Sequence, residues 1–284
     1  MTVENWRSKG EKVTIFNNEF FVIDDKSDKK TLLILHGYAC SSYDYYKILP
    51  ELSKEYRVVI PDLISFGSST KFIERYFTVL EQADAITELL KTLGIKEVSI
   101  FAHDYGASVA SELISRKNSS LINFNIQQLI LSNYYLPQEY FIEEKDCDST
   151  KKSFTKSTTS MLFTYSFFKK NKEKSLFKAD ILSDEDFKNM WSLHTYNDGI
   201  DIIDFIANYD NERNIFWDRW MNALKYSGIK TKIFWGEKDI FNDVEIIEML
   251  AANIEDEDFK FIKNCGYYPM LEKPVQLSEF ILNS

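Results

Sequence analysis

Short, continuous apolar runs alternate along this chain with stretches in which apolar residues recur at helical spacing. Continuous runs of this kind are typical of strands that are covered on both faces, as in parallel sheets. The runs predict strands at 31–35, 57–62, 98–101, 122–133, 231–239 and 258–262. The helical spacing predicts helices at 41–54, 78–93, 106–117, 243–252 and 273–282. A hairpin is predicted over 12–24, around Asn17-Asn18. Alternating strands and helices predict a mainly parallel sheet flanked by helices, in the α/β class.

This alternation lapses between residues 134 and 227. The segment is charged, is rich in Ser and Thr around 149–160, and is helical in pattern wherever it has a pattern. The simplest interpretation is a helical cap inserted between two parts of one sheet. The predicted organisation is therefore a first core part at 1–133, a cap at 134–227 and a second core part at 228–284. Such a cap would lie over the strand ends, where ligands bind in open α/β sheets.

The sharpest local signal is the change from strand to helix around Asp104, which leaves no room for a loop. The residues two positions before and after it are Ala102 and Gly106, both small. This is the pattern of the nucleophile elbow, whose central side chain stands exposed above a sheet. Asp tolerates the left-handed backbone conformation that such a turn requires. The alternative interpretation is a simple turn in which Asp104 caps the helix.

The composition of the chain limits its possible binding partners more than it limits its possible folds. The length of 284 residues allows one large domain, and the formal net charge of −10 argues against a nucleic-acid partner or an anionic membrane surface. No apolar run is long enough to span a bilayer and no secretory signal is visible, so a cytoplasmic protein is expected. Aromatic residues make up 15% of the chain, which suits either an aromatic-lined pocket or a compositional bias of the genome.

The three cysteines, Cys40, Cys147 and Cys265, are odd in number and widely spaced. They indicate neither a disulfide framework nor a metal-ligand pattern, and they favour a reducing compartment. We therefore expect no metal and no cofactor.

Polar residues stand at the ends of several predicted strands. His36-Gly37-Tyr38 follows the first buried strand, and its backbone N–H groups can join that of Tyr105 in an oxyanion hole. Asp239 and Tyr267 follow the last two strands. An elbow residue, then an acid, then a polar residue in the final loop is the order of an α/β-hydrolase triad.

With these motifs in place, the chain resembles the α/β-hydrolases of the epoxide hydrolase and haloalkane dehalogenase group over nearly its whole length. Within that group it looks most like the mesoderm-specific transcript proteins. The resemblance rests on LHGYACSSYDYY (35–46), PDLISFGSS (61–69), FAHDYGA (101–107), WGEKD (235–239), CGYYPMLEKP (265–274) and two segments of the predicted cap, MW…NDG (190–199) and RW…AL (219–224).

The resemblance implies that Asp104 attacks an electrophilic carbon and forms an alkyl ester. The amides of Tyr38 and Tyr105 would stabilise the oxyanion when water hydrolyses that ester, and Asp239 would orient the general base. Epoxide hydrolases of the group protonate the epoxide oxygen with cap tyrosines, and the candidates here are Tyr165, Tyr196 and Tyr209. Dehalogenases of the group usually place Trp after the nucleophile, so Tyr105 counts against halide release as the main reaction.

One departure from the family pattern stands out, because Tyr267 occupies the position of the expected base His. Only about one tyrosine in a thousand is ionised at pH 7, and a neighbouring carboxylate lowers that fraction. The other histidines are His36 and His103 beside the elbow and His194 in the predicted cap, and a packing role is the simpler interpretation for the last two.

The sequence therefore predicts an epoxide hydrolase-like enzyme that acts on a small apolar electrophile and turns over slowly. The alternative is a catalytically inactive member of the fold that binds a small apolar ligand or a partner.

Overall fold

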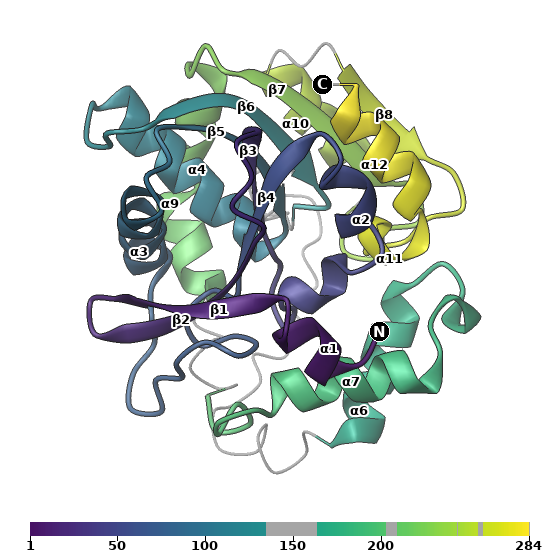
Figure 1. Cartoon of the computed structure of the whole chain (residues 1–284). Helices are drawn as coiled ribbons and strands as arrows, with labels where there is room; N and C mark the ends of the chain where they lie inside the picture. The colour runs from purple at the N-terminus through teal and green to yellow at the C-terminus, as the bar shows by residue number, and fades with distance from the viewer. Residues whose placement is uncertain (135–163, 203–208, 243, 255–257, 284) are drawn as a thin grey trace.

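A computed structural model describes residues 1–134, 164–202, 209–242, 244–254 and 258–283 (Figure 1). Eight strands of these residues form one sheet, parallel except where β2 pairs with β1 and β4. The predicted hairpin and the mostly parallel sheet are thus confirmed. In sheet order the strands are β1 (Gly10–Ile15), β2 (Asn18–Asp24), β4 (Tyr56–Pro61), β3 (Lys30–Leu35), β5 (Glu97–His103), β6 (Asn125–Ser132), β7 (Lys230–Gly236) and β8 (Asp258–Ile262).

Helices flank this sheet, as predicted, and the described residues between 134 and 227 form helices and no strand. None of the helices in the described ranges is long and apolar enough to cross a membrane. The helices are α1 (Val3–Arg7), η1 (Ser42–Tyr45), α2 (Leu49–Leu52), α3 (Val79–Thr92), α4 (Tyr105–Asn118), α6 (Tyr165–Ser175), η3 (Ala179–Ile181), α7 (Asp184–His194), α9 (Tyr209–Lys225), α10 (Val244–Ile254), α11 (Pro269–Glu272) and α12 (Pro274–Leu282).

The predicted helix over 41–54 is wrong, because two short helices, η1 and α2, replace it. Pro50 lies in the first turn of α2. Proline fits there, where its missing N–H has no intrahelical partner, but it would interrupt one continuous helix. By contrast, α3 begins and ends as predicted. Thr78 and Glu81 form a capping box at its start, and Gly94 takes a positive φ of 71° just after its end.

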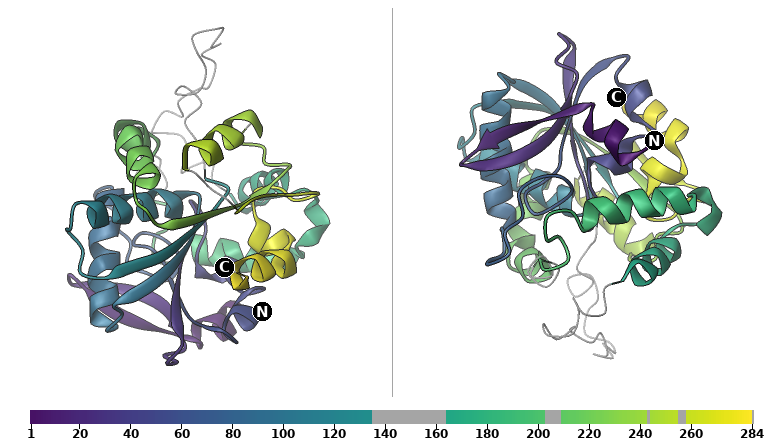
Figure 2. Two further views of the ribbon diagram at one scale, coloured as in Figure 1. Left: turned by 90° about the horizontal axis from the view of Figure 1, so that it is seen from above. Right: turned by 60° about the horizontal axis from the view of Figure 1, so that its bottom comes forward.

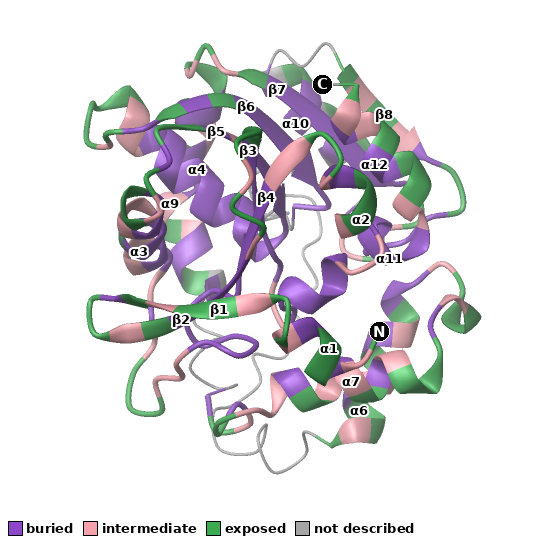
Figure 3. Ribbon diagram, in the orientation of Figure 1, coloured by how far each residue is buried: buried purple, intermediate pink, exposed green. Residues whose placement is uncertain are grey.

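Side chains of the central strands are buried on both faces of the sheet. In β3, Leu33 and Leu35 face the core with α3, α4, α9 and α10, whereas Leu32 and Ile34 face the core with α2 and α12. Figure 2 shows these helices on the two sides of the sheet, and Figure 3 shows the buried strands between them. Double coverage explains why the strands read as continuous apolar runs rather than as alternating ones.

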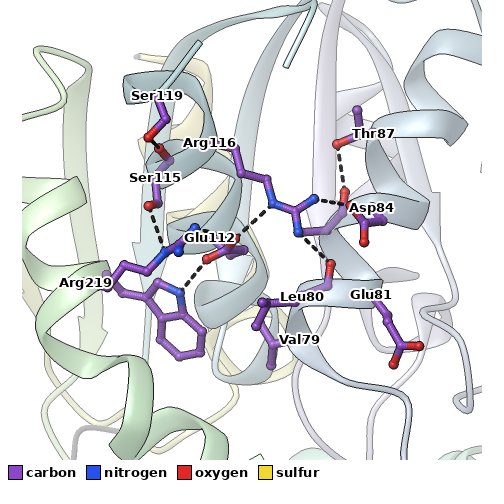
Figure 4. A network of polar contacts seen from close by, with 12 residues as sticks. Val79, Leu80, Glu81, Asp84, Thr87, Glu112, Ser115, Arg116, Ser119 and Arg219 are labelled. Carbon is purple, nitrogen blue, oxygen red and sulfur yellow. Dashed lines mark hydrogen bonds and ion pairs between the residues drawn. The ribbon is translucent and has the colours of Figure 1, made fainter. Parts of the chain in front are cut away.

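Glu112 joins three helices on one face of the sheet (Figure 4). Its buried carboxylate on α4 accepts hydrogen bonds from Arg219 Nη2 (2.9 Å) and Trp220 Nε1 (3.0 Å), both on α9. It also accepts one from Arg116 Nε (2.9 Å), and Arg116 continues to the Leu80 carbonyl on α3. Although α9 lies within the predicted cap range, it packs on α4. The division into core and cap stays a prediction.

The helices α6 and α7, also in the predicted cap range, contact the loop that follows β3. Lys172 of α6 forms a buried ion pair with Asp44 (3.3 Å). Asp186 of α7 accepts a hydrogen bond from the Tyr46 hydroxyl (2.9 Å). This segment is therefore fixed to the loop that leads out of the central sheet.

Replacing the buried carboxylate of Glu112 should be costly. Glu112→Ala leaves two arginines and an indole N–H without their shared acceptor, so we expect the free energy of unfolding to fall by about 3–5 kcal/mol. Chemical denaturation measures this loss. Asp84→Ala removes the exposed carboxylate at the other end of the network and should cost less than about 1 kcal/mol. Equal losses in the two variants would contradict a central role for Glu112.

Candidate active site

Asp104 lies at the junction of β5 and α4 in a strained backbone conformation, with φ of 50° and ψ of −113°. Non-glycine residues in such sparsely populated regions cost about 1–3 kcal/mol and persist only where the surroundings enforce them. Here the enforcing contact is the first turn of α4 against the end of β3, since a Cβ on Gly106 would overlap the Leu35 carbonyl. The Asp104 side chain makes none of the hydrogen bonds to the second or third residue of α4 that a capping side chain makes. The simple capping interpretation is therefore wrong.

Two backbone N–H groups converge on the Asp104 carboxylate. The amide of Tyr38 donates to Oδ2 at 2.8 Å, and the amide of Tyr105 donates to the same carboxylate. The loop comes this close because residue 37 is glycine: a Cβ there would lie 3.0 Å from Asp104 Oδ2 and 2.6 Å from His103 Nδ1. The Tyr38 amide, one of the two predicted for an oxyanion hole, thus bonds this carboxylate, and the oxyanion hole itself stays a prediction.

The two histidines beside the turn form hydrogen bonds with backbone groups. His36 Nε2 accepts from the Leu63 amide (2.9 Å), which leaves its Nδ1 to donate to the Gly37 carbonyl (2.9 Å). His103 Nε2 donates to the Tyr267 carbonyl (2.8 Å). Burial lowers the pKa of His103 to about 4, so its ring is neutral near pH 7. His103 thus links the elbow to the loop that carries residue 267.

Tyr267 reaches the predicted site, and its hydroxyl interacts with the Asp104 carboxylate, which lowers the pKa of Asp104 and raises that of Tyr267. Its amide donates to the Ser175 carbonyl at the end of α6 (2.8 Å). Its ring packs against Phe241 and His103, with ring centres 4.6 and 5.0 Å away. The phenol of Tyr267 is therefore held at the site through both its backbone and its ring.

Asp239 follows β7 as predicted, but its hydrogen bonds go elsewhere. The carboxylate accepts from four donors: Asn133 Nδ2, Trp235 Nε1, the Phe241 amide and Asn242 Nδ2, at 2.8–3.1 Å. Within the described residues, Asp239 influences Tyr267 through its charge and not through a hydrogen bond. Asn133 was not predicted to be a partner of Asp239. Its position directly after β6, which pairs with β7, could have indicated that it lies near the end of β7.

Burial dominates the electrostatics of the site. It raises the pKa of Asp104 to about 6, although hydrogen bonds from Tyr38 and Tyr267 and the positive charge of Arg213 oppose the shift. Burial, followed by the negative charges of Asp104 and Asp239, holds the pKa of Tyr267 well above its usual value near 10. At neutral pH the pair is a carboxylate beside a neutral phenol.

Two of the predicted cap tyrosines are engaged away from Asp104. The Tyr165 hydroxyl bonds to the exposed Asp184 (2.9 Å), and the ring of Tyr196 lies 4.1 Å from the guanidinium of Arg7. The His194 ring packs against Phe168 in the predicted cap, with ring centres 5.6 Å apart, as expected for a packing residue.

Tyr209 lies on the other side of the elbow. Its ring packs on that of Tyr105 (4.7 Å), and its hydroxyl pairs with Ser108 (3.0 Å), which also bonds Tyr134 (3.1 Å). Arg213, one turn further along α9, is buried with its guanidinium 5.0 Å from the Tyr209 ring centre. The sequence analysis missed Tyr134 and Arg213.

Of the three cysteines, Cys40 and Cys265 are buried free thiols, and Cys147 lies outside the described residues. Within those residues, no group of three or more His, Cys, Asp and Glu side chains could hold a metal ion.

Comparison with known families and structures agrees with this architecture. The family model described as "alpha/beta hydrolase fold" matches residues 30–274. The chain belongs to the alpha/beta hydrolase fold family. This α/β-hydrolase shares 18% identity with the solved structure of the epoxide hydrolase CorEH, with a TM-score of 0.75 over 96% of this chain and 97% of that one, which is a likeness of fold.

Two relatives match this α/β-hydrolase over almost its full length. The protein named as hydrolase LipZ of Mycobacterium tuberculosis is 26% identical, over 99% of this chain and 97% of the relative. The mesoderm-specific transcript homolog protein of Homo sapiens is 27% identical, over 96% of this chain and 84% of the relative. The predicted resemblance is thereby confirmed, and family and relatives together support a hydrolase.

The raised pKa of Asp104 has a measurable effect on the stability of this α/β-hydrolase. An acid whose pKa rises from 3.8 in the unfolded chain to about 6 in the folded one destabilises the fold as pH rises through that window. Asp104→Asn removes the charge, so the free energy of unfolding should increase by up to about 3 kcal/mol at pH 8 and change little at pH 4. Denaturation at both pH values measures it, with the exposed Asp180→Asn as an unchanged control. No gain at pH 8 would contradict a buried, charged Asp104.

Proposed function

We propose that this α/β-hydrolase acts on a small apolar electrophile by the epoxide hydrolase-like route, in which Asp104 attacks carbon and forms an alkyl ester. One observation carries the proposal: a buried carboxylate stands on a strained turn, with two backbone N–H groups aimed at it. A carboxylate that only capped a helix would need neither the strain nor the paired amides. Strain of this kind clusters at functional sites.

The same amides suit the second step of that route. When water attacks the ester carbon, negative charge develops on the ester carbonyl oxygen. If that oxygen is Asp104 Oδ2, the Tyr38 amide already lies 2.8 Å away, and the Tyr105 amide donates to the same carboxylate. Removing one such donor typically costs about 10²- to 10³-fold in rate. Oxyanion stabilisation is therefore available for ester hydrolysis.

The general base is what the resting site lacks. Tyr267 is a neutral phenol that donates to Asp104, so it cannot accept a proton from water in that state. His103 is a weak base, because burial lowers its pKa to about 4. A missing general base typically lowers a rate by about 10²- to 10⁴-fold. Hydrolysis of the ester is therefore slow as long as Tyr267 keeps its proton.

Apolar substrate character is supported by the aromatic rings of Tyr105, Tyr209, Tyr267 and Phe241 around the elbow. A partial relative points the same way: the soluble epoxide hydrolase of Corynebacterium is 35% identical over 79 residues, 28% of this chain. The alternative is a catalytically inactive member of the fold that binds a ligand or a partner. Tyr267 in the position of the expected histidine favours that alternative.

Intact mass spectrometry tests the proposal directly. After incubation with a panel of primary alkyl bromides, the protein should gain one alkyl group in place of one hydrogen, and Asp104→Ala should gain none. The adduct should persist for hours because no base serves its hydrolysis. A wild-type protein that stays unmodified by every bromide and every epoxide tested would favour the binding protein instead.

Restoring an imidazole at position 267 should release the trapped ester. We expect Tyr267→His to speed alcohol release from the bromide-derived ester by about 10²- to 10⁴-fold, since a neutral imidazole can accept the proton of the attacking water. Tyr268→His, one residue further along, is the matched control and should leave the ester in place. Equal release rates in Tyr267→His and wild type would argue against residue 267 as the base position.

A further inference from the structure

We propose that Tyr267 is the acid that protonates the opening epoxide, and that the phenolate left behind is the base that hydrolyses the ester. An epoxide would then supply its own base, whereas an alkyl halide would not. The inference rests on the proposed function of Asp104. It reverses the order of roles expected for residue 267, because the residue gives its proton before it takes one.

The position of the Tyr267 hydroxyl is the first argument. It interacts with the Asp104 carboxylate, and the neighbouring His103 holds Tyr267 there through its carbonyl (2.8 Å) and its ring (centres 5.0 Å apart). Of the tyrosines in the predicted cap range, Tyr165 bonds the exposed Asp184 through its hydroxyl, and Tyr209 pairs its hydroxyl with Ser108. The tyrosine that accompanies the carboxylate is therefore the one in the final loop and not one from the predicted cap.

The first step balances with these two side chains alone. A bond forms between Asp104 and the epoxide carbon, and the ring C–O bond breaks with its electron pair on oxygen. That oxygen takes the Tyr267 hydroxyl proton, so the single negative charge passes from the carboxylate to the phenol. An alkoxide is a much stronger base than a phenolate. Proton transfer from Tyr267 to the alkoxide is therefore favourable once the ester has removed the charge of Asp104.

Ester formation also removes one obstacle to the phenolate. Apart from burial, the charge of Asp104 is the larger of the two carboxylate contributions that keep the pKa of Tyr267 high, ahead of Asp239. An esterified Asp104 is neutral, so the pKa of Tyr267 falls in the intermediate. Hydrolysis of the ester, which needs the phenolate of Tyr267, thus takes place when the phenolate is most stable.

The second step returns both groups to their starting state. Water attacks the ester carbon and gives one proton to the phenolate of Tyr267, while the oxyanion lies against the amides of Tyr38 and Tyr105. The tetrahedral intermediate then expels the diol oxygen, which takes the second proton of the water. Asp104 is again a carboxylate and Tyr267 a phenol. An alkyl halide breaks this cycle, because the halide leaves without a proton and Tyr267 stays neutral.

Paired substrates of equal chain length test this cycle, for example 1,2-epoxyhexane and 1-bromohexane. With wild-type protein at pH 8, the bromide should give a persistent ester and the epoxide should give diol over many turnovers with little ester present. The epoxide-derived ester should hydrolyse at least about 10²-fold faster than the bromide-derived ester. Equal lifetimes for the two esters would overturn the proposed base.

Tyr267→Phe isolates the acid. The bromide should still alkylate this variant within a few-fold of the wild-type rate, which also shows that the variant is folded. Epoxide opening should fall by about 10²- to 10⁴-fold, and any ester formed should persist. Tyr268→Phe, which removes the neighbouring buried phenol, should match wild type with both reagents.

The outcomes separate the two levels of the proposal. Wild-type epoxide opening in Tyr267→Phe would overturn the acid role while leaving Asp104 as the nucleophile. If the bromide failed to alkylate wild-type protein, the proposed function itself would fail, and this inference with it.

Discussion

The close approach of α4 to the end of β3 is the constraint on which the site depends. No Cβ fits at position 106, and Gly37 leaves similarly little space between its loop and Asp104. Gly37 and Gly106 allow the neighbouring backbone segments to approach each other closely here. The turn between β5 and α4 therefore has no room to relax, and Asp104 is held at a φ of 50°. The strain is sustained by the sheet, whose central strands are buried on both faces.

The buried negative charges of this region are stabilised mainly by hydrogen-bond donors of the backbone and of uncharged side chains. Asp104 receives two amides and a phenol, and Asp239 receives an indole, two carboxamides and an amide. Buried carboxylates that are fully supplied with such donors stay ionised without a counter-charge in direct contact. The arrangement keeps Asp104 charged at neutral pH and leaves Tyr267 neutral beside it.

Much of this architecture could be predicted from local sequence patterns. The β3 run, the hairpin, the α3 cap residues and the turn at Asp104 are all set within a few residues, and they matched. The helix predicted over 41–54 is wrong because Pro50 interrupts the helical spacing and lies in the first turn of a separate helix. The partners of Asp239 and of Tyr267 were not predictable in this way, since Asn133 lies 106 residues from Asp239 and the Tyr267 amide pairs with Ser175. Pairings of that range depend on tertiary structure and leave no short motif.

The end of α6 is joined to two separate loops of the site. Lys172 pairs with Asp44 in the segment that follows Tyr38, and the carbonyl of Ser175 accepts a hydrogen bond from the amide of Tyr267. Movement of this helix away from the sheet would therefore disturb residue 267 and the segment after residue 38 together. A relative with a different segment in place of α6 would need other supports for these two loops. Exchange of this segment between members of the fold, whether by evolution or in the laboratory, is thus restricted by one ion pair and one backbone hydrogen bond.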